Sequence, residues 1–285
     1  MNNTGKGVCF ALLSGLSIAV MGVFVKLTDG QLSNFTLLFF RFLISLLILL
    51  PLVKKEANFS FKIKFPVILS VRCVFGFIAL ACYFIAIQYI PLANAVLLEN
   101  TFPVFVPIIL FIATGMKTDK KVLGGIFLSF IGIIIILNPG RNILQSASFI
   151  GLIGGICAAV SFVCLRLMLA KDSSQFSNIL LWFFFFCTIL SGILMIFDFS
   201  MPDLIQFLFL ILIGVFGYFF QFLMTKALQY ACVRIVSPMM YFSVLFAGCF
   251  DFVIWGITPH MYTLIGVVIT VLGAIYVILH RKTLD

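Results

Sequence analysis

The segment Ala86-Ile87-Gln88-Tyr89 closes one long apolar run of the chain, and Ala227-Leu228-Gln229-Tyr230 closes another, 141 residues later. Outward from these two segments, the same offset joins identical residues in the apolar runs that follow. The pairs are Phe105 with Phe246, Phe111 with Phe252, Gly115 with Gly256, Leu123 with Leu264, Gly125 with Gly266, Gly132 with Gly273 and, at an offset of 144 residues, Gly7 with Gly151 and Ser17 with Ser161. The chain therefore repeats itself, and we divide it into residues 1–140 and residues 141–285 of one membrane domain.

Apolar runs long enough to cross a lipid bilayer fill both halves. A transmembrane helix needs about 20 consecutive, mainly apolar residues. The candidate spans are residues 8–27, 34–53, 66–89, 92–114, 121–138, 149–170, 178–197, 205–229, 233–257 and 260–280. Short connections separate them, and several contain Pro or Gly, as in Asn138-Pro139-Gly140. The pattern predicts an all-α integral membrane protein with ten transmembrane helices.

The composition excludes a soluble protein. Hydrophobic residues make up 64% of the chain and charged residues only 9%, whereas a soluble domain carries about 25% charged residues because its surface faces water. The eight cysteines lie inside or at the ends of apolar segments, without a C-x-x-C pair or a histidine partner. We interpret them as small packing residues. We therefore expect no metal, no cofactor and no nucleic-acid partner, and we attribute the net charge of +9 to membrane topology.

The basic residues are unevenly divided between the two sides of the predicted membrane domain. With ten spans, both termini and every loop from an even-numbered to an odd-numbered span share one side. That side holds Lys6, Lys54, Lys55, Lys62, Lys64, Lys117, Lys120, Lys121, Lys171, Arg234, Arg281 and Lys282. The opposite loops hold Arg141, with Lys26 at a helix end. Because cytoplasmic loops are enriched in Lys and Arg, we expect both termini in the cytoplasm.

Five spans in each half form an odd number of crossings, which places the second half upside down relative to the first. Inverted repeats that meet at a cavity near the bilayer midplane are a recurrent architecture of secondary transporters. Channels and some membrane enzymes are also duplicated. The repeat therefore favours a transporter over these two alternatives without excluding them.

Several motifs of the chain occur in an order that is familiar from one family. In the first half they are Leu38-Phe39-Phe40-Arg41-Phe42-Leu43, residues 83–95, Asn100-Thr101-Phe102-Pro103-Val104-Phe105, Leu123-Gly124-Gly125 and Gly132, and in the second half they are residues 227–230 and 266–273. Each half resembles an EamA domain of the drug/metabolite transporter superfamily, over essentially the whole chain. Arg72, Gly76 and Ile90-Pro91-Leu92-Ala93 are similar to the branch that includes bacterial S-adenosylmethionine transporters.

The resemblance implies ten helices, a central cavity between the halves and alternating access without ATP hydrolysis. It also implies a small metabolite as substrate. The chain departs from the family in two places. Gly115-Met116-Lys117 stands where members often carry a Gly-Glu pair, and Pro103 in the fourth span corresponds to Val244 in the ninth. These departures put the symmetry of any gate in doubt.

Charged residues within the spans are the first candidates for function, because a charge at the centre of a membrane helix costs about 2.5–3.5 kcal/mol on insertion scales. Glu99 lies deep in the fourth span, and we expect it to be a substrate or proton site or to pair with a buried arginine. Arg41 is the leading structural partner, or it binds a substrate carboxylate. Arg72 and Arg166 lie nearer the cytoplasmic side, where snorkelling to the interface is favoured, with anion binding as the alternative for Arg72. Asp251, near the outer end of the ninth span, is expected to meet water.

Neutral polar side chains complete the candidate substrate site. Tyr83, Tyr218 and Tyr241 fall in spans that the resemblance places around the cavity, and a tyrosine ring attracts a cation. The further candidates are Asn100, Gln221, Ser17 and Ser161. For Ser17, packing of small residues between helices is the alternative.

These observations together predict a secondary active transporter and no catalytic residues. We expect it to move a small polar or zwitterionic metabolite, such as an amino acid or S-adenosylmethionine, across a bacterial inner membrane. The chain contains no G-x-x-x-x-G-K-[ST] sequence for nucleotide binding, so the drive is a coupling ion such as a proton, or a counter-substrate. An exporter of drugs or toxic metabolites, a passive channel and an intramembrane enzyme are the alternatives. We expect a monomer or a homodimer in the lipid bilayer.

Overall fold

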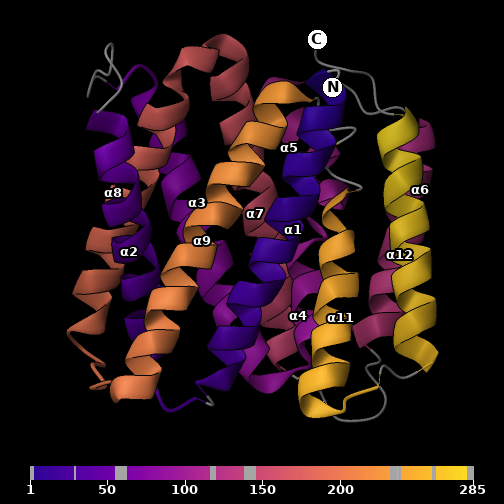
Figure 1. Ribbon diagram of the computed structural model, residues 1–285. Helices are drawn as coiled ribbons and strands as arrows, with labels where there is room; N and C mark the ends of the chain where they lie inside the picture. The colour runs from indigo at the N-terminus through magenta and orange to yellow at the C-terminus, as the bar shows by residue number, and fades with distance from the viewer. Residues whose placement is uncertain are drawn as a thin grey trace.

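The computed structural model describes residues 3–28, 30–54, 63–115, 120–137, 146–231, 236, 239–258 and 261–280. Long helices dominate these residues and stand side by side in one bundle (Figure 1). They are α1 (Asn3–Leu27), α2 (Asn34–Lys54), α3 (Pro66–Tyr89), α4 (Leu92–Glu99), α5 (Phe102–Thr114), α6 (Lys120–Leu137), α7 (Ser146–Lys171), α8 (Phe176–Met195), α9 (Leu204–Tyr230), α11 (Phe242–Trp255) and α12 (Met261–His280), with a short 3₁₀ helix, η1 (Ser173–Gln175), before α8.

Seven helical spans of the described residues are long and apolar enough to cross a membrane: α1, α2, α3, the pair α4 and α5, α7, α8 and α9. Shorter apolar helices within α6, α11 and α12 occupy the remaining predicted spans. The outer surface carries large exposed apolar side chains, such as Phe127, Phe197 and Leu204, as expected of a surface that faces lipid. The chain is therefore a helical, multi-pass membrane protein.

Part of the predicted topology lies outside the described residues. This applies to the boundary between the two halves at residues 140 and 141, and to the start of the ninth predicted span. It also applies to the loop residues Lys55, Lys62, Lys117, Arg141, Arg234, Arg281 and Lys282. The start of α1 and the end of α12 nevertheless lie at the same end of the bundle (Figure 1).

The fourth predicted span is not one continuous helix. α4 ends at Glu99 and α5 begins at Phe102. Pro103 has no N–H, so it cannot continue the hydrogen bonds of α4 to the carbonyl of Glu99. The N–H groups of the two connecting residues still donate to carbonyls of α4: that of Asn100 donates to Val96 at 3.0 Å, and that of Thr101 donates to Leu98 at 3.2 Å. The backbone is thus interrupted directly beside the charged Glu99.

Two helices end in the same way at positions 141 residues apart. Gly115 follows α5 with a φ angle of 69°, and Gly256 follows α11 with a φ angle of 64°. This left-handed conformation favours glycine and stops a helix by satisfying its last carbonyls. The N–H of Gly115 donates to Phe111, and that of Gly256 donates to Phe252.

The helices pair over long distances in the sequence. α1 packs along α9, α3 along α7, and α6 along α12, while α2 contacts both α8 and α9. α11 packs on α1 and α4, and α7 packs on α4 and α5. In Figure 1, α6 and α12 stand at one edge of the bundle and α2 and α8 at the other.

Small residues let α6 and α12 approach closely. A Cβ atom on Gly132 would lie 2.6 Å from the backbone nitrogen of Thr270, and one on Gly273 would lie 2.6 Å from that of Ser129. The hydroxyl of Ser129 donates to the carbonyl of Thr270 at 3.2 Å. Close packing of this kind is a main source of helix association in lipid, where apolar burial gives no advantage.

Gly132→Ala is expected to lower the free energy of unfolding by about 1–3 kcal/mol, because its methyl group forces the two backbones apart. Gly124→Ala on the same helix is the matched control, since a Cβ atom there meets no atom within 4 Å. Thermal unfolding of the two purified variants in detergent measures the difference. Equal midpoints would contradict the close packing of α6 and α12.

Candidate functional site

Glu99 lies at the junction of α4, α3 and α7. The residue is 5% exposed, and its Oε2 atom has no hydrogen-bond partner. A Cβ atom on Gly154 of α7 would lie 3.2 Å from this oxygen and 3.0 Å from the Cβ atom of Cys82 on α3. Gly154 therefore makes room for the carboxylate, which sits among apolar helices without a bonded cation.

The next residue of α7 explains how the break between α4 and α5 is accommodated. A Cβ atom on Gly155 would collide with the hydroxyl of Thr101 and the carbonyl of Leu98. The hydroxyl of Thr101 donates to that same carbonyl at 2.7 Å. Two successive glycines thus let the backbone of α7 lie directly against the interrupted helix, where freed polar groups must be satisfied within the protein.

Asn100 joins the break to the second half of the chain. Its side-chain amide donates to the carbonyl of Val96 at 2.8 Å and to the hydroxyl of Ser243 on α11 at 2.9 Å. Ser243 also packs against Gly15 of α1. The predicted site residue Asn100 is therefore a structural link between α4 and α11 as well as a neighbour of Glu99.

Arg41 is a large polar side chain that has no hydrogen-bond partner among the described residues. It lies on α2 and is fully buried, and none of its three guanidinium nitrogens has a hydrogen-bond partner. The guanidinium carbon lies 4.2 Å from the ring centroid of Phe42, and the side chain packs on Gly217 of α9. The charges of Arg41 and Glu99 act on each other, but the two side chains form no ion pair within 4.0 Å. The structure therefore shows no direct ion pair between the two groups, and their structural pairing stays a prediction.

Arg72 does not snorkel to the interface as expected. It is 1% exposed, and its Nη1 atom donates to the carbonyl and the hydroxyl of Ser161 on α7, each at 3.2 Å. The hydroxyl of Ser161 donates in return to the carbonyl of Arg72 at 3.1 Å. The guanidinium also lies over the ring of Phe183 at 4.8 Å. The predicted candidates Arg72 and Ser161 are thus brought together between α3, α7 and α8.

The remaining predicted residues are buried but differ in their contacts. The hydroxyl of Tyr83 donates to the carbonyl of Ile18 at 3.3 Å, and that of Ser17 donates to Leu13 within its own helix at 2.8 Å. Tyr218 stacks on Phe222 with centroids 5.5 Å apart. The Oε1 atom of Gln221 and the hydroxyl of Tyr241 have no partner. The hydroxyls of Ser17 and Tyr83 are therefore bonded to backbone carbonyls, whereas Gln221 and Tyr241 have buried polar atoms without a partner among the described residues.

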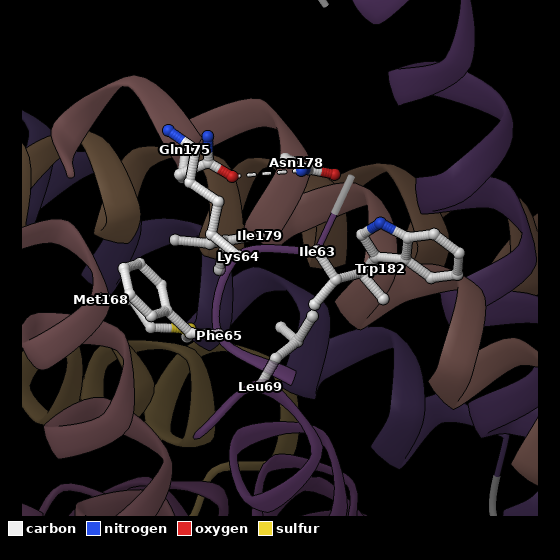
Figure 2. Close-up of a pocket in the computed structure, with 9 residues that line it drawn as sticks. All are labelled: Ile63, Lys64, Phe65, Leu69, Met168, Gln175, Asn178, Ile179 and Trp182. Atoms are coloured by element: carbon white, nitrogen blue, oxygen red, sulfur yellow. Dashed lines mark hydrogen bonds between the residues drawn. The ribbon is translucent and has the colours of Figure 1, made fainter. Parts of the chain in front are cut away.

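A surface pocket lies away from all of these residues. It opens between the start of α3, the end of α7 and the start of α8, and its walls include Lys64, Met168, Asn178 and Trp182 (Figure 2). At its rim Lys64 forms an ion pair with Asp172. The bonds that Lys64 and Ser174 donate lower the pKa of Asp172 to about 2, so this carboxylate is ionised at neutral pH. No predicted site residue lines this pocket.

Sequence reasoning misjudged or missed several residues that shape the site. Asp251 does not meet water: it is 2% exposed and forms an ion pair with Lys26 at 3.2 Å. Ser243, Gly154 and Gly155 carry no charge, so nothing in the sequence separates them from ordinary packing residues. Among the described residues, no group of three or more His, Cys, Asp or Glu side chains is placed to hold a metal ion.

Known proteins show similarity along the whole chain. A family model described as the EamA-like transporter family matches residues 5–138 and again residues 145–279. A pseudopaline exporter of Pseudomonas aeruginosa is 28% identical, with 95% of each chain covered. An S-adenosylmethionine uptake transporter of Rickettsia bellii is 23% identical over 97% of this chain and 94% of its own. Solute carrier family 35 member G1 of mouse is 27% identical over 95% of this chain and 78% of its own.

A protein of known crystal structure has the same fold, with a TM-score of 0.66 over 96% of this chain and 95% of that chain, at 17% identity. The family match confirms the resemblance that the motifs of both halves indicated. The named relatives are transporters, which supports transport and gives no indication of an enzyme. The chain belongs to the EamA-like transporter family.

Proposed function

We propose that the protein is a secondary active transporter that moves a small polar or zwitterionic metabolite across a bacterial inner membrane by alternating access. The observation that carries this proposal is a pair of buried charged residues with unbonded atoms: the three guanidinium nitrogens of Arg41 and the Oε2 atom of Glu99 have no hydrogen-bond partner among the described residues. Polar groups of this kind inside a membrane protein are costly and mark substrate or ion pathways. A zwitterion supplies what both groups lack, since its carboxylate matches Arg41 and its amine matches Glu99.

The proposed cycle uses two inverted halves of five helices each, residues 1–140 and residues 141–285, with ten crossings in total. The pairing of helices supports this arrangement. In the repeat, α1 corresponds to α7, and α3 corresponds to α9. Exchanging the two halves therefore turns the pair α1–α9 into the pair α7–α3. Both pairs are packed along each other. α6 and α12 correspond to each other and pack through Gly132 and its counterpart Gly273.

The orientation follows from the positive-inside rule, with both termini in the cytoplasm. The end of the bundle that holds the start of α1 and the end of α12 is then the inner end (Figure 1). An ion gradient, or exchange against a second substrate, supplies the drive. Uptake and export are the two candidate directions, and the similarity to the pseudopaline exporters favours export.

A thermal-shift screen of purified protein against amino acids, nucleosides and S-adenosylmethionine is expected to find a zwitterionic ligand that raises the unfolding midpoint. The methyl ester of that ligand lacks the carboxylate and is expected to give a much smaller shift, because Arg41 loses its partner. Counterflow in proteoliposomes then distinguishes a carrier from a channel. A broad panel without any gradient-dependent flux would count against transport of metabolites.

Glu99→Gln is expected to abolish gradient-dependent flux of the ligand found in this way, because the amide keeps the shape of the side chain and removes its charge. A loss of one charged contact costs about 2–5 kcal/mol of binding, or at least tenfold in affinity. Uptake of radiolabelled ligand into proteoliposomes measures the change. Flux equal to that of the parent protein would show that Glu99 plays no part in recognition.

The double variant Arg41→Met/Glu99→Gln is expected to unfold at a higher temperature than the parent protein and to bind no ligand. Replacing buried charges by apolar or neutral groups of similar size is often stabilising, by about 1–4 kcal/mol. Arg72→Met serves as the comparison, because it breaks the bonds to Ser161 and is expected to lower the midpoint. A double variant less stable than the parent would mean that Arg41 and Glu99 hold the fold together.

A further inference from the structure

One carboxylate joins three helices at the end of the bundle opposite the start of α1. Asp251, on α11, accepts hydrogen bonds at Oδ1 from the ammonium of Lys26 on α1 and from the N–H of Leu92, each at 3.2 Å. Its Oδ2 atom accepts from the N–H of Ala93 at 2.8 Å. The ammonium of Lys26 also lies 4.8 Å from the ring centroid of Trp255, so it is held on two sides.

The contact with Leu92 and Ala93 places Asp251 at the first turn of α4. The first N–H groups of a helix have no partner within the helix and carry a partial positive charge. The residue before α4 is Pro91, and no side chain of that residue caps the helix. The carboxylate of Asp251 therefore supplies the missing cap from a different helix.

α11 holds α4 at both ends. Asp251 binds its first turn, and Ser243 accepts the amide of Asn100 directly after its last residue, Glu99. α4 has only eight residues, so these two attachments fix its position along its whole length. α11 therefore helps to position Glu99, and the ion pair with Lys26 adds a bond from α1 to this unit at the end of the bundle where α4 begins.

The opposite end of the bundle has a different ion pair. The position 141 residues before Asp251 is Leu110, and the position 144 residues after Lys26 is Ala170, so the repeat does not reproduce the pair there. The ion pair described at that end, Lys64 with Asp172, has side chains that are 51% and 23% exposed, compared with 16% and 3% for Lys26 and Asp251. An exposed pair contributes little, and the more buried of the two pairs is the one between Lys26 and Asp251, at the end that the proposed orientation places outside.

We propose that Asp251 is a positioning residue of the transport cycle. It keeps α4, and Glu99 with it, attached to α11. Its ion pair with Lys26 acts as a latch, because it holds α1 against α4 and α11 at the outer end and so closes the path to the outside until α1 separates from these two helices. The proposal rests on the proposed function for its alternating access. The three hydrogen bonds of this carboxylate then have two roles: those from Leu92 and Ala93 cap α4 throughout the cycle, and the one from Lys26 breaks.

The native Cys82 is the reporter for the test, because its side chain lies beside Glu99 against Gly154. The parent for the experiment is a variant in which every other cysteine is replaced by serine or alanine, reconstituted in vesicles of known orientation. Lys26→Gln removes the ion pair and leaves the cap on α4 intact. It is expected to raise the rate at which a membrane-impermeant thiosulfonate labels Cys82 from the outer face by about tenfold, the effect of losing one charge-assisted hydrogen bond on a two-state equilibrium.

Lys64→Gln is the matched control, since it removes the exposed ion pair at the other end and is expected to leave outer-face labelling unchanged. Asp251→Ala separates the two roles. It removes the cap as well as the pair, so it is expected to unfold at a lower temperature than Lys26→Gln, with Asp251→Asn between them because an amide oxygen still accepts from Ala93.

Equal labelling of Cys82 in Lys26→Gln and in the parent overturns the latch, as does an increase from the cytoplasmic face alone. Equal unfolding midpoints for Asp251→Ala and Lys26→Gln overturn the positioning of α4. The labelling requires no transported substrate. If the protein moves no metabolite but shows the labelling change, the proposed function is contradicted and the latch is supported. If it moves a metabolite but shows no labelling change, the proposed function is supported and the latch is contradicted.

Discussion

Lipid offers no hydrogen-bonding partner, and the whole structure depends on how the chain meets that constraint. Continuous helices satisfy their own backbone, which is why long apolar runs account for most of the bundle. The interruption between α4 and α5 is the place where this solution fails. There the side-chain amide of Asn100 and the hydroxyl of Thr101 bond to freed polar groups, and two glycines of α7 let its backbone lie against the break. These specific contacts maintain the break, and the break holds Glu99 at a fixed place inside the membrane.

The internal repeat explains the packing of the scaffold better than it explains the polar residues. Gly115 and Gly256 end equivalent helices with the same left-handed turn, and Gly132 and Gly273 face each other's helices in the same way. The charged residues do not follow the repeat: Glu99 corresponds to Met240, and Asp251 corresponds to Leu110. The backbone is thus alike at these glycine positions of the two halves, while the charged residues of the interior differ.

The fold was largely predictable from the sequence because each helix is governed by local rules of length and apolarity. Glu99 was predictable for the same reason, since a charge in an apolar run is visible without knowledge of its neighbours. Contacts between helices were not. The burial of Arg72 depends on Ser161 and Phe183, which lie on two other helices, so its stem seemed free to snorkel. Asp251 seemed close to water because its position along the helix was known and the covering residues Lys26 and Trp255 were not. The break after Glu99 was missed because Pro103 is compatible with a kinked but continuous helix.

The buried charges fall into two groups, and the difference between them separates structure from transport. Asp251 has every partner that a carboxylate needs, from Lys26 and two backbone N–H groups, so it adds order without demanding a ligand. Arg41 and Glu99 are also buried, but the guanidinium nitrogens of Arg41 and the Oε2 atom of Glu99 have no hydrogen-bond partner among the described residues. A fold selected only for stability would replace such groups by apolar ones, because unbonded buried charge is costly. Their retention is explained if a bound substrate completes them during each cycle. In the two proposals together, the bonds that α4 donates to Asp251 help to position Glu99 for that substrate.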